Sequence, residues 1–450
     1  MNRVKIVQCT LMILSGLMST VVSLHAAVIK SASASYSDVS AAVVASRPGD
    51  TILIPPDTAL WRNMLIVRHG LHLQGAGETM TRIIAETANE PPYATIIYQP
   101  DRPAENDLFE ISGMAFDLQN RYQAVNLRND ADEPITKIKI HDNTFINCGP
   151  TAVISENSSL VYGVIYDNTF SANPGRGVYL QLTGNGYWPW RNLAVEYGDA
   201  NALYIEDNTI LASDDTFIGS SRGIRYVARF NTFLHIGTNS LSPWFDAHGN
   251  QPDDLSAVQR CEIYFNKLID PERRVGVMFD HRGGKALFFF NTISSDLLPV
   301  IYCREEYADD ICDYGSYIGP NPPQIPQHVS DSYYFENRNG DGTLIDGFEG
   351  YDCCDVLQEN SEFWSQKANF DGTAGMGVGP FDKIPARCNK GVAYWAVDKG
   401  GNWNLNNKTE NDGALYKATS ANRWELCYIP YIYPHPLRSL EPPKNLKFIE

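Results

Sequence analysis

The stretch Ile205-Glu-Asp-Asn208-Thr-Ile210 is one of six related stretches, each an apolar run followed by asparagine, usually threonine, and a large apolar residue. The others are Ile140-His-Asp-Asn143-Thr-Phe145, Ile165-Tyr-Asp-Asn168-Thr-Phe170, Ala228-Arg-Phe-Asn231-Thr-Phe233, Ile263-Tyr-Phe-Asn266-Lys-Leu268 and Phe288-Phe-Phe-Asn291-Thr-Ile293. Successive asparagines are 25, 40, 23, 35 and 25 residues apart. Three intervals are one period, and the other two equal that period plus about 15 and about 10 residues, which indicates a repeat with inserted loops.

This period, with alternating apolar residues and no helical pattern, indicates short strands that bury a face only when successive units stack. Asparagine at a fixed point suits stacking, because it tolerates left-handed turns and its amide can bond to the next asparagine at a strand spacing of about 4.8 Å. We therefore predict an all-β chain forming a right-handed parallel β-helix with an internal asparagine ladder. An ordinary β-sandwich is the alternative, since its strands also recur at short intervals.

Residues 1–26 have the pattern of a secretory signal peptide. Arg3 and Lys5 make a basic start, residues 11–22 an interrupted apolar core, and residues 24–27 a small-residue cleavage site. We expect the mature protein to be secreted by a bacterium. No other stretch approaches the apolar length of a transmembrane helix, so no membrane span is expected.

The chain is strongly acidic, with a formal charge of −17 over 450 residues. Removing Arg3 and Lys5 with the signal changes this to −17 − 2 = −19. Such acidity argues against nucleic acid and anionic membranes as partners.

Nine cysteines are present, and eight remain once Cys9 is removed with the signal. An oxidising compartment permits disulfides, and proximity in sequence suggests Cys303 with Cys312 and Cys388 with Cys427. Cys261 falls at an inward position of its strand and is expected to be a buried thiol.

The N-terminal part of the mature chain has the pattern of a cap over a first coil. Residues 37–43 suit a short amphipathic helix, and residues 48–55 and 65–77 suit a Pro-Gly turn and strands separated by glycine. This region resembles the start of secreted pectate-lyase-like β-helix proteins, and the repeats extend the resemblance to about residues 38–338. The resemblance implies the fold but not the chemistry, because this architecture carries lyases, hydrolases, tail-spike depolymerases and adhesins.

We expect the β-helix to occupy residues 27–345, followed by a Cys- and Trp-rich region over 346–440. Residues 332–337 suit one more ladder step, and residues 391–395, 414–417 and 424–429 suit a small β meander whose aromatics pack as a cap. Residues 430–437 resemble the closing segment of a group of uncharacterised bacterial secreted β-helix proteins. Residues 441–450 resemble a linker or the opening strand of a fibronectin type III-like module.

Residues at equal offsets from the ladder asparagine should be neighbours on adjacent coils. Arg225, Arg260 and Lys285 each lie six residues before it, and alternation predicts that they point outward. Tyr264, two residues before Asn266, should point outward as well. A column of cations about 5 Å apart is repulsive unless anions neutralise it, so we expect these four residues to bind substrate. A solvated face with Glu262 interleaved is the alternative.

A second alignment rests on three glycines. Arg222, His248 and Arg282 directly precede Gly223, Gly249 and Gly283, and Ser220, Asp246 and Asp280 lie three positions before these glycines. Asp246 and Asp280 should then be about one strand spacing apart, where they would share a proton, bind Ca²⁺ or pair with arginines. His248 is a histidine, a residue type whose ordinary pKa near neutrality suits proton transfer. The candidate catalytic residues are therefore His248, Arg282, Asp246, Asp280 and Arg222; a purely structural role for His248 is the alternative.

The two inserted loops, at about residues 184–198 and 250–258, should leave the same corner with one plain coil between them and so form a groove. The first contains Tyr187, Trp188 and Trp190, aromatic surface that could stack on sugar rings or pack within the loop. Residues 222–285 carry nine Lys and Arg against seven Asp and Glu. This local excess of +2 would attract an acidic polysaccharide.

If the resemblance extends to polysaccharide lyases, it implies β-elimination from a uronate-containing polysaccharide. Arg282, Arg222 or Ca²⁺ would neutralise the carboxylate, and His248 or an arginine of the cation column would be the base. If it extends to polygalacturonase-type hydrolases, paired carboxylates would activate water instead. Asp214-Asp215 and His248-Gly249 are similar to motifs of that family, but Ile210 after Asn208-Thr209 departs from its Asn-Thr-Asp. A non-catalytic adhesin or glycan-binding protein is the further alternative.

Overall fold

The computed structural model describes residues 26–86, 94–105, 108–129, 133–148, 151–156, 161–171, 178–184, 196–212, 216–235, 243–249, 257–269, 278–294, 301–303, 329–345, 348–350, 358–439 and 447–448. The signal-peptide prediction and the Cys303–Cys312 prediction lie outside what this description covers. Within these residues no helix is long and apolar enough to cross a membrane.

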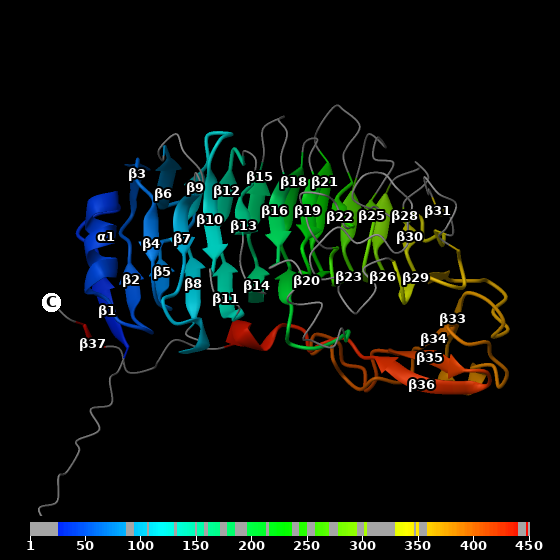
Figure 1. Cartoon of the computed structure of the whole chain (residues 1–450). Coiled ribbons are helices and arrows are strands. Elements are labelled where there is room, and N and C mark those ends of the chain that lie inside the picture. The colour runs from blue at the N-terminus through cyan, green and yellow to red at the C-terminus, as the bar shows by residue number, and fades with distance from the viewer. Residues whose placement is uncertain are drawn as a thin grey trace, which may run out of the picture.

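The chain winds into a solenoid with three parallel sheets, as Figure 1 shows. Sheet A contains β1 (Ala27–Lys30), β2 (Thr51–Leu53), β5 (His72–Gln74), β8 (Phe109–Ser112), β11 (Ile135–His141), β14 (Val161–Tyr166), β17 (Leu203–Glu206), β20 (Arg225–Arg229), β23 (Arg260–Tyr264), β26 (Lys285–Phe289), β29 (Ser332–Phe335), β32 (Phe363–Ser365) and β37 (Lys447–Phe448). Sheet B contains β3 (Asp57–Trp61), β6 (Thr81–Ala85), β9 (Ala115–Asp117), β12 (Thr144–Ile146), β15 (Thr169–Ser171), β18 (Thr209–Ala212), β21 (Thr232–His235), β24 (Lys267–Ile269), β27 (Thr292–Ser294) and β30 (Arg338–Asn339).

Sheet C completes each coil. It contains β4 (Leu65–Val67), β7 (Ala94–Tyr98), β10 (Gln123–Arg128), β13 (Val153–Glu156), β16 (Val178–Thr183), β19 (Thr216–Ser221), β22 (Phe245–Ala247), β25 (Phe279–His281), β28 (Ile301–Cys303) and β31 (Phe348–Gly350). Apart from β37, consecutive strands of each sheet come from consecutive coils, so the predicted parallel β-helix is confirmed. The strands continue to Ser365, beyond the boundary predicted at residue 345, because the last coil lacks the asparagine motif on which that boundary rested.

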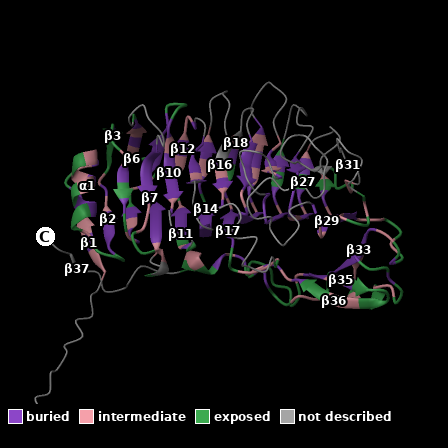
Figure 2. Ribbon diagram, viewed as in Figure 1, coloured by how far each residue is buried: buried purple, intermediate pink, exposed green. Residues whose placement is uncertain are grey.

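A short helix, α1 (Tyr36–Ala45), covers the first coil. Its N-cap is Ser35, whose hydroxyl accepts a hydrogen bond from the Asp38 amide. Val39 and Val43 are buried against the first coil, as the predicted cap requires, and the Trp61 indole donates to the Ala34 carbonyl. In Figure 2 the buried residues fill the interior along the whole length of the solenoid.

The asparagine ladder runs along the corner between sheets A and B. The Nδ2 of each asparagine donates to the Oδ1 of the next at 3.0–3.1 Å. The seven members, all buried, are Asn143, Asn168, Asn208, Asn231, Asn266, Asn291 and Asn337. The predicted ladder, including the step at Asn337, is therefore confirmed.

The left-handed residue at this corner precedes the asparagine and is not the asparagine itself. The backbone φ angle lies between 51° and 59° at Asp142, Asp167, Asp207, Phe230, Phe265, Phe290 and Glu336. This left-handed conformation is energetically unfavourable for residues other than glycine. At the phenylalanines, stacking offsets this penalty, since the rings of Phe230, Phe265 and Phe290 stack at centroid distances of 5.2 and 5.0 Å.

Replacing Asn231 by alanine should lower the free energy of unfolding by about 1–3 kcal/mol, because buried polar groups on Asn208 and Asn266 would lose their partner. The Asn208 and Asn231 side-chain amides donate to the next ladder oxygens at 3.0 Å each. Chemical denaturation measures the difference. Asn406→Ala, at an exposed asparagine of the C-terminal region, is the control and should change stability little; equal stability of the two variants would contradict the ladder's importance.

The C-terminal region packs on the outer face of sheet A. It holds a four-stranded sheet of β33 (Met376–Gly379), β34 (Ala393–Ala396), β35 (Ala414–Ser420) and β36 (Arg423–Tyr428), of which the last three form the predicted antiparallel meander. The chain then returns along sheet A to the 3-10 helix η4 (Pro436–Ser439), which contacts β11 and β14 (Figure 1). Two shorter 3-10 helices are η1 (Pro103–Glu105) and η3 (Phe381–Lys383).

A second hydrophobic core lies between this region and sheet A. Tyr204, Tyr264 and Phe289 point out of sheet A and pack with Trp395 and Tyr428. The prediction that the C-terminal aromatics pack as a cap is therefore confirmed. The tail predicted to open a fibronectin type III-like module instead supplies β37, which pairs in parallel with β1.

Cys388 and Cys427 are free thiols, so their predicted disulfide is wrong: proximity in sequence did not place their sulfur atoms together. Cys261 is fully buried, as predicted.

Candidate functional site

The candidate catalytic residues come together on the outer face of sheet C. Asp246 on β22 and Asp280 on β25 are register partners, as predicted. The residue paired with Asp246 on β19 is Gly219 and not Ser220, so the alignment of that coil was wrong by one residue. Arg222 follows β19 with a left-handed φ of 55°, which shows that the turn there differs from the other two.

The Arg282 guanidinium contacts the carboxylates of both Asp246 and Asp280. Its Nε and Nη2 donate to Asp246 Oδ1 at 3.0 and 2.6 Å, and its Nε lies 3.6 Å from Asp280 Oδ2. The other oxygen of Asp246 lies 3.1 Å from His248 Nε2. The structure thus brings together four of the five predicted residues in one chain of contacts, His248–Asp246–Arg282–Asp280.

Accessibility differs along this chain of contacts. The side chain of His248 is 23% exposed and that of Asp246 is 16%, against 8% for Arg282 and 6% for Asp280. Burial opposes ionisation of Asp246, but the hydrogen bond from His248 and the charge of Arg282 outweigh it and keep its pKa below the ordinary value. Asp246 is therefore an anion that orients His248, and His248 is the group that a ligand could reach most easily.

The inward side of the same strands anchors the site. His281 follows Asp280 and is fully buried, with Nδ1 2.7 Å from the Tyr334 hydroxyl and Nε2 3.0 Å from the Gly283 carbonyl. Burial lowers the pKa of His281 to about 4, so its ring is neutral at physiological pH. The bonds of His281 fix the turn that carries Arg282.

The two predicted loops leave the corner that follows sheet C. One connects β16 to β17 and the other connects β22 to β23, while β19 and β20 are joined by a short turn at residues 222–224. The backbone connections therefore agree with the predicted positions of the insertions. Tyr187, Trp188 and Trp190 lie outside the described residues, so their predicted role in binding sugar stays a prediction.

The predicted cation column is correct in register but not in exposure. Arg225, Arg260 and Lys285 are successive partners in sheet A. Arg225 and Arg260 are buried, and Arg260 pairs with Asp199 at 2.6 Å. Lys285 pairs with Asp331 at 3.2 Å. These contacts neutralise Arg260 and Lys285 within the protein, and burial keeps both arginines away from substrate.

Tyr264 is likewise buried, and its hydroxyl accepts a hydrogen bond from Arg229 Nη1 at 2.8 Å. Its predicted outward direction is correct, but the C-terminal region covers it, with the ring edge-on to Trp403 at 6.0 Å. Its predicted contact with substrate is therefore not compatible with the fold.

A third cluster, on the outer face of sheet A near η4, was not predicted. Glu110 Oε1 lies 2.7 Å from His141 Nε2, 3.1 Å from Lys139 Nζ and 3.8 Å from His72 Nε2. Burial opposes ionisation of Glu110, but the contact with His141 and the positive charges keep its pKa at about 2. Lys139 lies four residues before its ladder asparagine, so alignment at that offset would have revealed the cluster.

The residues at the candidate site do not make a calcium site. Ca²⁺ takes six to eight oxygen ligands, whereas Asp246 and Asp280 both contact the Arg282 guanidinium. Among the described residues, no group of three or more His, Cys, Asp or Glu side chains is arranged to hold a metal ion. Arg282 supplies the positive charge that calcium would bring.

No family model and no curated protein matches the chain. Among solved structures, an alginate lyase from Paenibacillus sp. str. FPU-7 aligns with a TM-score of 0.36 at 10% identity, over 62% of this chain and 98% of that one. ORF18 of Geobacillus virus E2 aligns with a TM-score of 0.26 at 13% identity, over 87% of this chain and 72% of that one. Similarities this distant assign neither a family nor an activity to the chain.

Proposed function

We propose that this protein binds an acidic, uronate-containing polysaccharide on the outer face of sheet C and cleaves it by β-elimination. The observation that carries the proposal is the contact chain of Arg282, Asp246 and His248, which ends in its most exposed member. A histidine oriented by an ionised carboxylate is a common arrangement for a general base.

His248 is the proposed base. A proton on its Nε2 is donated to Asp246, which leaves the lone pair of Nδ1 to take a proton from the carbon next to the uronate carboxyl. Asp246 stabilises the imidazolium that results, and Arg282 fixes Asp246 from the other side. Arg282 and Asp246 are positioning residues here, because they act through His248.

The elimination needs a cation near the uronate carboxylate, because negative charge develops there as the proton leaves. Arg282 is shared between two carboxylates, so we assign this role to Arg222, at the turn one coil earlier. The electron pair of the broken C–H bond forms the new double bond, and the glycosidic C–O bond breaks. The departing oxygen takes the proton from the His248 imidazolium, which restores the neutral ring.

Hydrolysis by the pair Asp246 and Asp280 is less compatible with the site. A glycoside hydrolase needs a carboxylic acid that stays protonated until it reaches the leaving oxygen. The pKa of Asp246 is lowered and not raised, and the same arginine contacts both carboxylates. The alternative function is glycan binding without cleavage. It would use the same face of sheet C and would differ from elimination only in giving no product.

The test is to incubate the purified protein with polygalacturonate, alginate, hyaluronan and a neutral glucan, and to follow the ultraviolet absorbance of the unsaturated product. We expect absorbance to rise with at least one uronate polymer and not with the glucan. Retention of a uronate polymer without any product would show a binding protein, and the elimination mechanism would be wrong.

A further inference from the structure

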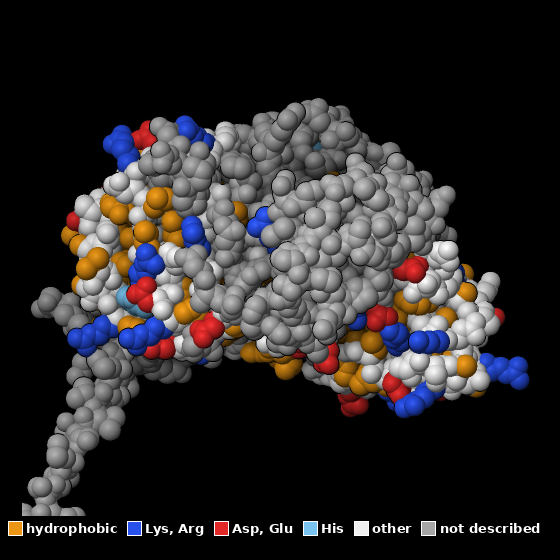
Figure 3. All heavy atoms as spheres, in the orientation of Figure 1, with side chains coloured by type: hydrophobic (Ala, Val, Ile, Leu, Met, Phe, Trp, Pro, Cys, Tyr) orange, Lys and Arg blue, Asp and Glu red, His pale blue; other side chains and the backbone are white. Residues whose placement is uncertain are grey.

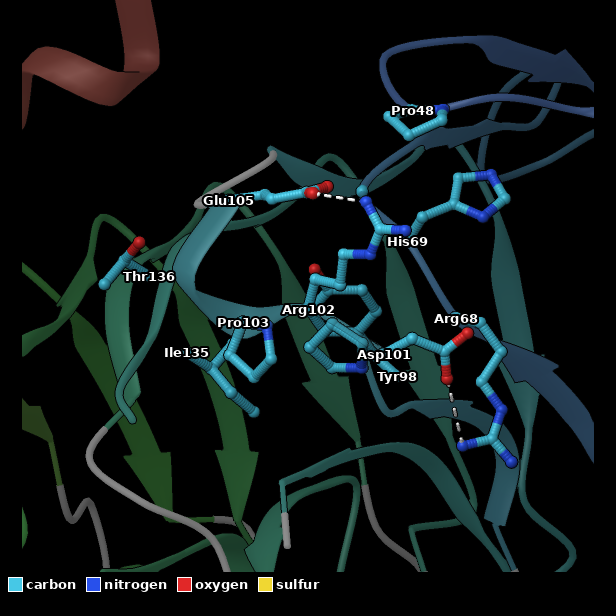
Figure 4. Close-up of a pocket in the computed structure, with 12 residues that line it drawn as sticks. Pro48, Arg68, His69, Tyr98, Asp101, Arg102, Pro103, Glu105, Ile135 and Thr136 are labelled. Carbon is cyan, nitrogen blue, oxygen red and sulfur yellow. Dashed lines mark hydrogen bonds and ion pairs between the residues drawn. The ribbon is translucent and has the colours of Figure 1, made fainter. Parts of the chain in front are cut away.

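A separate cavity of about 280 Å³ lies near the N-terminal end of the solenoid, at the corner between sheets C and A (Figure 4). Its walls come from the turns after β4 and β7 and from the start of β11. Over the strands at this end, Figure 3 shows hydrophobic side chains with charged ones among them. The volume is close to the lower limit for small-molecule sites, which suits one or two rings.

The rim of the cavity carries two cations and two anions. Arg102 Nη1 pairs with Glu105 Oε1 at 2.7 Å, and Arg68 Nη1 lies 3.9 Å from Asp101 Oδ1. Arg102 and Asp101 are 75% and 71% exposed, so both can turn toward a ligand. The rim therefore presents several donors and acceptors with no net charge.

Apolar side chains form part of the cavity wall. The Tyr98 ring is buried and stacks on Phe109 with a centroid distance of 4.0 Å and an interplanar angle of 2°. Pro103 and Ile135 line the same space. An apolar floor below a polar rim matches a sugar ring, which has apolar C–H faces and hydroxyls around its edge.

Thr136 gives an independent sign of a ligand. Thr136 lines the cavity, and its hydroxyl oxygen is buried and has no hydrogen-bond partner among the described residues. A β-bulge between Ile135 and Ile138 places it there, with Lys137 in a left-handed conformation at φ 55°. Only glycine fits beside the bulge, because a Cβ at Gly163 would lie 2.2 Å from the Ile138 carbonyl oxygen.

We propose that this cavity is a non-catalytic binding site for one neutral sugar residue. Carboxylates accept hydrogen bonds from sugar hydroxyls, guanidinium groups donate to them, and the balanced rim charge does not require an anionic ligand. The cavity follows β7 and the candidate catalytic site follows β22, five steps apart in sheet C, or about 24 Å. The proposal concerns a second site and does not depend on the elimination mechanism.

The test is saturation-transfer NMR on the whole protein, with the methyl glycosides of glucose, galactose, mannose, rhamnose and galacturonic acid as probes. We expect at least one neutral glycoside to bind. Asp101→Ala with Arg102→Ala should weaken that binding at least about tenfold, and Thr136→Val should weaken it as well. Arg62→Ala, which breaks an exposed pair with Glu86 outside the cavity, should bind normally.

His248→Ala should also bind the glycoside normally, which separates this site from the proposed catalytic site. Three results would each overturn the proposal: no signal with any neutral glycoside, unchanged binding in the Asp101 and Arg102 double variant, or binding of the galacturonide alone. Because both rim residues are exposed, circular dichroism of the double variant should match that of the wild type.

Discussion

Replacing His248 by alanine is expected to reduce the rate of product formation from a uronate polymer by two or more orders of magnitude, with binding of the polymer largely kept. General base catalysis contributes about 10²–10⁴ in rate, and His248 is the histidine of the contact chain, held by Asp246 and 23% exposed. The measurement is initial rate by ultraviolet absorbance beside retention on immobilised polymer.

Two further variants test the role of His248 as the base and the role of Arg282 as a positioning residue. His248→Gln can still donate to Asp246 but cannot serve as a base, so it should be as inactive as His248→Ala. Arg282→Ala leaves Asp246 and Asp280 without their shared cation, so it should lower the rate by a similar factor. Arg423→Ala removes an arginine that is 71% exposed, on β36, and should be fully active. Activity that survives both His248→Ala and Arg282→Ala would place the chemistry elsewhere.

Replacing Arg229 by alanine should destabilise the fold by about 3–5 kcal/mol, because it leaves the buried carboxylate of Glu206 without its main partner. Arg229 is fully buried and donates to Glu206 Oε1 at 2.9 Å, to the Tyr264 hydroxyl at 2.8 Å and to the Ile432 carbonyl at 2.8 Å. It therefore joins sheet A to the returning C-terminal segment. Urea denaturation of the variant measures the loss, and proteolysis should then cut first in the C-terminal region.

A double variant distinguishes the lost charge pair from lost packing. Glu206→Gln with Arg229→Met removes both charges and keeps most of the volume, so it should regain much of the stability that Arg229→Ala loses. Arg423→Ala, whose pair with Glu425 is exposed, should cost less than about 1 kcal/mol. An Arg229→Ala protein as stable as Arg423→Ala would mean that the C-terminal region is not fixed to sheet A through Arg229.

The coil architecture could be predicted because the solenoid repeats one local rule. Each ladder asparagine bonds to the asparagine of the next coil, so it must recur once per coil. One coil consists of three short strands and their turns. The spacing of the asparagines from Asn143 to Asn337 therefore shows directly which segments stack as coils. The final coil, which contains Trp364 on β32, has no such marker. Its position depends on packing against the C-terminal sheet, which the period does not encode.

The candidate site could be predicted where glycine spacing and strand register agree. Asp246 and Asp280 lie at the same offset from their glycines and are register partners, so they were aligned correctly. The coil of Arg222 turns through a left-handed residue, which moves Gly219 into the column where Ser220 was expected. This one-residue shift in register depends on the backbone conformation of the turn and cannot be read from the spacing of the glycines.

The burial of the cation column could not be predicted from the strands that carry it. Alternation correctly gives the outward direction of Tyr264, but it does not say what lies outside the sheet. The covering segment is remote in sequence, since Arg229, on the same strand as Arg225, donates to the carbonyl of Tyr431, 202 residues later. Contacts of this length come from tertiary packing and not from the local pattern.

The central claim is that elimination takes place on the outer face of sheet C. It is tested most directly by measuring the masses of the products formed in water labelled with the heavy oxygen isotope. Elimination adds no water, so products that are reduced with borohydride as they form, before the anomeric oxygen exchanges with solvent, should carry an unsaturated sugar at the new end and no heavy oxygen. His248→Ala should give neither fragment at a measurable rate. Heavy oxygen in the reduced products of the wild type would show hydrolysis. A uronate polymer that is bound but stays intact would show that the site binds without cleaving. Either result would contradict the mechanism proposed for His248, Asp246 and Arg282.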